Sequence, residues 1–74
     1  MERRFYKELW KLRFEKMLKL EKDSIVAYQA LLDESKRRFK NHSINAHLER
    51  LITDEKKHAL LVQDLIQILE RQAE

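Results

Sequence analysis

The sequence of 74 residues contains no cysteine, no glycine and no proline. Without cysteine, disulfide bonds and thiolate metal sites are excluded, and the composition fits a cytoplasmic location, which we expect. Without glycine, the chain lacks the raw material of phosphate-binding loops and nucleophile elbows. Enzymes that depend on those loops are therefore excluded.

Long apolar runs are missing as well. The longest have four residues, Ile25–Tyr28 and Ala59–Val62. A membrane-spanning helix needs about 20 apolar residues, so we expect no membrane span and no secretory segment. Below about 70–80 residues a single core rarely supplies more than ~3–5 kcal/mol, and small folds add disulfides, a metal or oligomerisation. Only a metal and oligomerisation are open to this chain.

What the sequence does have is helix-forming residues at helical spacing. Leu, Glu, Lys and Arg dominate, and charged residues make up 39% of the chain. Apolar residues recur every three or four positions without a breaker, which predicts one helix over about residues 3–38. Turn residues gather at about 39–43, where Asn41 or Ser43 could cap a second helix over about 43–71. The predicted fold is a single all-α domain, an antiparallel two-helix hairpin.

A hairpin of this kind cannot bury both of its apolar stripes alone. Each helix covers only one flank of the other, and the remaining apolar surface needs a partner. The sequence has no internal repeat, so the partner is expected to be a second copy of the chain. We therefore predict a homodimer of hairpins that forms a four-helix bundle, or a higher multiple of such dimers.

Three polar residues interrupt the apolar stripes. At ~100° per residue, Glu21 lies on the stripe of the first helix, and Glu55 and His58 lie on that of the second. Burying a carboxylate without a partner costs several kcal/mol at least. Three compensations are open: an ion pair with Lys or Arg, a hydrogen bond between Glu and His, or a divalent metal.

The spacing favours the metal. In metal-binding four-helix bundles, two helices each contribute a Glu and the other two each contribute Glu-x-x-His, all pointing inward. Two copies of Glu21 and of Glu55-x-x-His58 supply four carboxylates and two imidazoles, which suit iron or manganese better than structural zinc. The ligands lie level only if the turn is centred near residue 39. His42 and His47 lie near the turn without comparable carboxylate geometry and are left out.

This pattern resembles the first half of a rubrerythrin or ferritin-like four-helix bundle. Glu21 is followed two turns later by Tyr28, and Glu55-x-x-His58 stands in an acidic context before an apolar run. A full-length member contains two such halves, whereas this chain has one. It is therefore similar to the encapsulated-ferritin type, whose two-helix subunits form a di-iron ferroxidase centre between them.

The resemblance, which covers about residues 17–70, implies two iron ions per dimer, with Mn or Zn as possible substitutes. It implies that Glu55 bridges the two ions, that Glu21 and His58 are terminal ligands, and that Tyr28 is a nearby hydrogen-bond partner. It also implies oxidation of Fe(II) by O₂ or peroxide, in iron homeostasis or oxidative-stress protection, with an encapsulating shell as a possible partner. The chain has no rubredoxin-like cysteine cluster, so the electron-transfer path of a rubrerythrin is not available.

Two other interpretations stay open. The hairpin could be a non-catalytic dimerisation or assembly module. Alternatively, the aromatic and basic segment 3–16 could bind anionic lipid or nucleic acid. Glu8 and Glu15 dilute the charge of that segment, so we expect neither a membrane nor a nucleic acid as partner. We expect the segment instead to overhang the hairpin and to pack dimers into a larger assembly.

Overall fold

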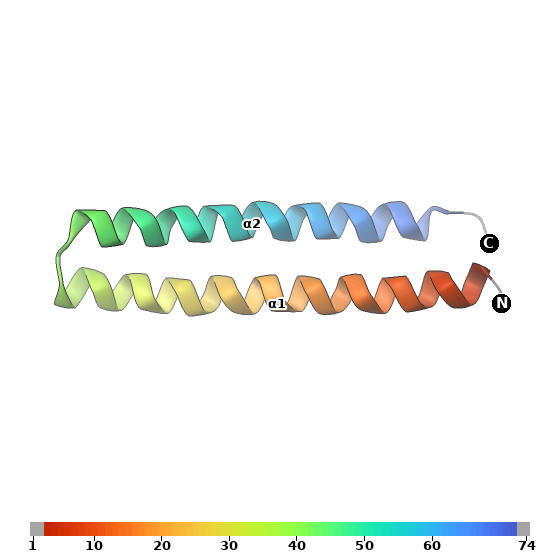
Figure 1. Ribbon diagram of the computed structural model, residues 1–74, viewed down its shortest axis with the longest axis horizontal. Helices are drawn as coiled ribbons and strands as arrows, with labels where there is room; N and C mark the ends of the chain where they lie inside the picture. Colours follow the sequence, from red (N-terminus) through yellow and green to blue (C-terminus); the bar gives the residue numbers. More distant parts are fainter. Residues whose placement is uncertain (1–2, 73–74) are drawn as a thin grey trace.

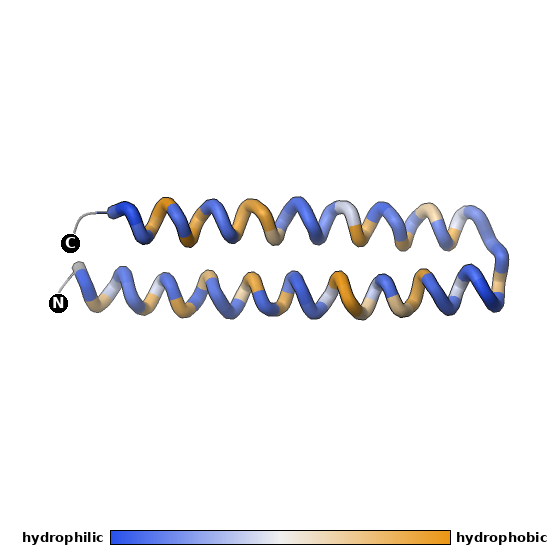
Figure 2. The backbone as a smooth tube through the Cα atoms, turned by 180° about the vertical axis from the view of Figure 1, so that it is seen from behind, coloured by the Kyte–Doolittle hydropathy of each residue, from blue (hydrophilic) through white to orange (hydrophobic). Residues whose placement is uncertain are grey.

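The chain folds into two long antiparallel helices, as a computed structural model of residues 3–72 describes (Figure 1). Helix α1 spans Arg3–Arg38 and helix α2 spans His42–Glu70. The described residues contain no strand, so the predicted all-α hairpin is confirmed. Figure 2 shows polar and apolar residues alternating along both helices. No helix in this part of the chain combines the length and the apolar character that crossing a membrane requires.

The turn is shorter than expected because Asn41 caps α2. The Asn41 Oδ1 accepts a hydrogen bond from the backbone N–H of Ile44 at 3.0 Å, which satisfies a free donor of the first turn. Ser43, the other candidate cap, lies within α2. The left-handed residue is Lys40, with φ of 48°, and the N–H groups of Phe39 and Lys40 both donate to the Ser35 carbonyl. The turn is thus residues 39–41 rather than 39–43.

The two helices meet along a seam with a strict seven-residue repeat. Seam positions alternate in steps of four and three residues, the pattern of a coiled coil, and all of them are buried or half-buried. In α1 they are Lys7, Lys11, Phe14, Leu18, Glu21, Ile25, Tyr28, Leu32 and Ser35. In α2 they are Asn45, Leu48, Ile52, Glu55, Ala59, Val62, Ile66 and Leu69.

Polar contacts close the seam at both ends. Beside the turn, the hydroxyl of Ser35, only 4% exposed, donates to Asn45 Oδ1 at 2.8 Å. At the other end, Lys7 Nζ donates to the carbonyls of Glu70 and Gln72 at 3.1 and 2.9 Å. The last turns of α2 therefore lie beside the first turns of α1. The expectation that the whole segment 3–16 overhangs the hairpin is wrong, because Lys7 and Lys11 already lie beside Glu70. Only the start of α1, which has 36 residues against 29 in α2, extends past the end of α2 (Figure 1).

A second set of apolar positions remains exposed. Fifteen large hydrophobic side chains of the described residues are exposed, whereas the buried apolar core comprises Leu32, Ile52, Ala59 and Val62. Most of these exposed side chains belong to residues that stand one position before a seam residue. We call the surface that these residues form the open face. In α1 it contains Tyr6, Trp10, Met17, Leu20 and Leu31; in α2 it contains Ile44, Leu51, Leu61, Leu65 and Ile68.

The open face belongs to both helices on the same side of the hairpin. In antiparallel helices, positions preceding the seam turn toward one common side. A groove next to the turn confirms this, because Leu31 of α1 lines it together with Ile44 and His47 of α2. The opposite side is mostly polar and carries the ion pair of Lys36 with Glu49, 3.7 Å apart. The hairpin therefore has one broad apolar side and one polar side.

Candidate metal centre

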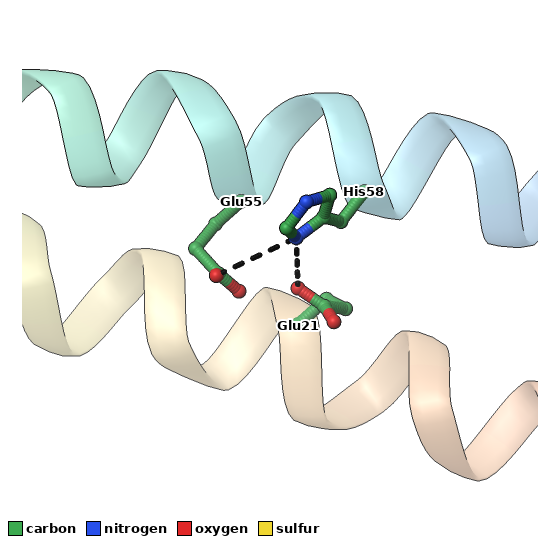
Figure 3. Close-up of side chains that lie close together, drawn as sticks. All are labelled: Glu21, Glu55 and His58. Carbon is green, nitrogen blue, oxygen red and sulfur yellow. Dashed lines mark ion pairs between the residues drawn. The ribbon is translucent and has the colours of Figure 1, made fainter.

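Glu21, Glu55 and His58 come together at the middle of the hairpin (Figure 3). Glu21 lies near the midpoint of α1, and Glu55 and His58 lie on either side of the midpoint of α2. The three ligands are level because the turn ends at Asn41 rather than two residues later. We predicted that the ligands lie level only if the turn is centred near residue 39, and the turn at residues 39–41 is close to that position.

The three side chains converge on one point. One ligand atom of each residue can be chosen so that all lie within 4.8 Å of one another. The His58 Nδ1 is 3.8 Å from Glu21 Oε2 and 3.7 Å from Glu55 Oε1, and Figure 3 shows both approaches. These separations exceed hydrogen-bond length. His58 therefore lies close to both carboxylates without a hydrogen bond to either.

The electrostatics of the site are unfavourable to two free carboxylates. The pKa of Glu21 is raised above its ordinary value of 4.5, first by a hydrogen bond that its protonated form shares with Glu55. Loss of solvent and repulsion by the Glu55 charge raise this pKa further, and the charge of His58 lowers it. Glu21 Oε2 is itself buried without a hydrogen-bond donor. These effects favour a proton shared between the two carboxylates, and a cation in the same place would act in the same sense.

Three ways of stabilising the two carboxylates were considered above: an ion pair with Lys or Arg, a hydrogen bond with His58, and a divalent metal. Within the described residues, neither Glu21 nor Glu55 has a Lys or Arg nitrogen at ion-pair distance. His58 is too distant for a hydrogen bond to either. A shared proton or a metal cation remains, and a divalent ion would satisfy both carboxylates and the imidazole at once.

One hairpin supplies only part of a coordination sphere. The Glu21 and Glu55 side chains are 24% and 21% exposed, whereas His58 is 55% exposed. His58 precedes Ala59 of the seam and so belongs to the open face. Within one hairpin Glu21 and Glu55 lie in the seam, and the His58 ring reaches toward them from a more exposed position beside it (Figure 3). That all three residues point into the core of a four-helix bundle stays a prediction.

The other candidates lie outside this cluster. Tyr28 is a half-buried seam residue two turns from Glu21, and its role as a hydrogen-bond partner of the site stays a prediction. His42 is the first residue of α2, and His47 lies 2.6 Å from the Ser43 carbonyl through its Nδ1. Asp54, next to Glu55, is half-buried on the open face and is not part of the group of three.

Comparisons with protein-family models, curated proteins and solved structures give no match. They therefore place the chain in no family. The case for a metal rests on the three side chains themselves: their identity, their convergence and the unsatisfied oxygen of Glu21.

Proposed function

We propose that two copies of the hairpin form a four-helix bundle that holds a di-iron carboxylate centre and oxidises Fe(II). The observation that carries the proposal is the pair of facing carboxylates with His58 beside them and, within residues 3–72, no Lys or Arg nitrogen at ion-pair distance from either. Burying two acids in the seam of so small a fold costs stability that a bound cation recovers. Oxygen-rich ligation with some imidazole suits iron or manganese.

The second copy completes the site. A di-metal centre in a bundle uses four carboxylates and two imidazoles, twice what one hairpin holds. His58 approaches both carboxylates but is 55% exposed, and it lies among the apolar residues of the open face, where a partner would lie. In the dimer, as the resemblance to ferritin-like proteins implies, Glu55 would be a ligand shared by the two ions, Glu21 and His58 would each hold one ion, and Tyr28 would be a nearby hydrogen-bond partner.

The chain's residues have defined tasks in this function. When bound, the two ions supply the redox chemistry toward O₂ or peroxide. Glu21 and Glu55 bind as deprotonated carboxylates and His58 as neutral imidazole, so loading of the site releases the proton that the two acids share. The seam neighbours Leu18 and Ile25 exclude water on the α1 side, and Ile52 and Ala59 do so on the α2 side. Fe(II) bound there as substrate would give one electron per ion and become Fe(III), so that two ions would reduce one O₂ to peroxide or one peroxide to water.

An anaerobic Fe(II) titration of the purified protein, followed by air, tests the proposal. We expect about one Fe per chain, a dimer or a multiple of it, and an oxo-bridged diferric absorption band after O₂. Glu55→Ala should abolish iron binding and the band. Glu49→Ala removes an acid on the same helix that pairs with Lys36 on the polar side, and it should leave both signals intact. No iron uptake by a well-folded oligomer would contradict the proposal.

The second candidate is a non-catalytic dimerisation or assembly module, which the extent of the open face favours. Both functions need the same partner surface, so the oligomeric state does not distinguish them. Metal binding distinguishes them, because only the di-iron centre requires it. A cytoplasmic location, an encapsulating shell and the use of Mn or Zn in place of iron stay predictions.

A further inference from the structure

An apolar groove lies on the open face beside the turn. Its volume is about 390 Å³, and its main lining residues are Leu31, Phe39, Ile44, His47 and Leu48. The large side chains Leu31, Phe39 and Ile44 are 52%, 66% and 42% exposed. Leaving such a surface in water is unfavourable, and its concave shape suits a large flat side chain.

The chain's single tryptophan lies on the same face at the opposite end. Trp10 is 46% exposed and stands three seven-residue repeats before Leu31, so both occupy the same heptad position. The Arg13 guanidinium lies 5.3 Å from the centre of the indole ring, and the Phe14 ring lies 5.7 Å away. These neighbours hold a large apolar ring at the surface. Such an anchor is typical of the centre of a binding contact.

The groove and Trp10 are equidistant from the candidate metal centre. Trp10 precedes Glu21 by eleven residues, and Leu31 follows Glu21 by ten. At ~1.5 Å per residue, each lies about 15 Å from the level of the site. A two-fold axis that crosses the hairpin at this level would therefore bring the Trp10 of one copy onto the groove of the other.

The open face of α2 has the same symmetry. Its residues pair off at equal distances from position 56, which lies between Glu55 and His58: Ile44 with Ile68, His47 with Leu65, Leu51 with Leu61, and Asp54 with His58. Two of these four pairs, Ile44 with Ile68 and Leu51 with Leu61, set apolar residues against apolar residues. The pair nearest the axis sets an acid against an imidazole, so charge is complementary where the site lies.

The size of the face fits a dimer. The hairpin measures 55 Å by 14 Å by 12 Å. A face of 55 Å by 14 Å covers about 770 Å², close to the ~800 Å² that each partner buries in a specific interface.

We infer that Trp10 of a second copy occupies the groove beside the turn, so that two hairpins associate face to face with their turns at opposite ends. This inference rests on the proposed function for the shared centre at the axis. It adds the occupant of the groove and the orientation of the two chains. The other two-fold arrangement, with its axis along the hairpin, would place both turns at the same end and leave Trp10 beside its partner's terminal end.

Trp10 fluorescence tests the occupant directly, because the chain has no other tryptophan. Emission is followed across protein concentration, without metal and with Zn²⁺, alongside the mass of the assembly. We expect a blue shift that tracks dimer formation. Ile44→Gln should weaken the dimer at least about tenfold and reverse the shift. Val26→Gln, at a 70% exposed apolar position on the other side of the hairpin, should do neither. Dimers whose Trp10 stays exposed to solvent, or a chain that stays monomeric, would overturn the inference.

A distance measurement tests the orientation. Arg37→Cys introduces the only thiol next to the turn, and a spin label there reports the separation of the two turns. Turns at opposite ends place the labels on the order of 50 Å apart, at ~1.5 Å per residue from the central axis. A short separation would overturn the inference even if iron binds. Dimers with buried Trp10 and distant labels but without iron uptake would support the inference and contradict the di-iron centre.

Discussion

The carboxylates of Glu21 and Glu55 face each other across the seam, one from each helix, and His58 Nδ1 lies 3.8 Å and 3.7 Å from their nearest oxygens. In an ordinary coiled coil these two positions would hold apolar residues. Two acids in their place repel each other, and a shared proton relieves that repulsion. If the proposed metal binds there, its binding and the folding of the hairpin should be interdependent.

Without metal, stability should fall as the pH rises through the acidic range. The folded pKa of Glu21 is raised above its ordinary value of 4.5. The folded chain therefore binds more protons than the unfolded chain between about pH 4.5 and the raised pKa, and its stability decreases across that window. Urea denaturation of the metal-free protein at several pH values measures this. Glu21→Gln should flatten the dependence, whereas Glu15→Gln, at an exposed position on the same helix, should not. A metal-free stability that rises across the window would contradict the shared proton.

Replacing the acids with leucine should separate stability from metal binding. Glu55→Leu puts an apolar side chain into a seam position, so the metal-free protein should become more stable. The same variant should lose iron binding and the stabilisation that iron gives to the parent protein. Thermal unfolding with and without Fe(II) under anaerobic conditions gives both values. If the parent gains no stability from Fe(II), Mn²⁺ or Zn²⁺, the assembly-module interpretation is favoured.

The helices could be predicted because nothing in the sequence opposes them. No breaker interrupts residues 3–38, and apolar residues recur at a helical period. The end of the turn could not be predicted, because Asn41 and Ser43 are both good caps and only the packing of Ser35 against Asn45 selects between them. That buried hydrogen bond gave no sequence signal of its own, since serine and asparagine near a turn are common.

The candidate site was predictable in its members but not in its arrangement. Polar residues on an apolar stripe pointed to Glu21, Glu55 and His58, and the structure brings these three together. The apolar stripe of α2, however, is two overlapping heptad patterns, and only one of them faces α1. Because His58 belongs to the other, its side chain is 55% exposed although its ring approaches Glu21 and Glu55. Separating the two patterns requires knowing the interhelical register, which depends on the turn.

The N-cap residue Asn41 should contribute to stability, whereas Ser43, the other candidate cap, should not. Asn41→Ala removes the hydrogen bond to the Ile44 N–H and should cost about 1 kcal/mol. Ser43→Ala, two residues later inside the helix, should change stability by less than about 0.5 kcal/mol. Denaturant midpoints of the two variants against the parent protein give the comparison. Equal losses would mean that Ser43 also caps the helix in solution.

Shortening a buried side chain of the seam should reveal how much stability a second copy of the chain supplies. Ile52 is 6% exposed, so Ile52→Ala should cost about 2–5 kcal/mol, as much as a core of this size provides alone. The variant should therefore be unfolded when dilute and regain structure at higher protein concentration, because association with a second copy favours the folded chain. Leu60→Ala, at a 61% exposed position outside the seam and the open face, should behave like the parent. Circular dichroism over a concentration series measures the effect. An Ile52→Ala variant whose helicity is independent of concentration would show that the hairpin needs no second copy to fold.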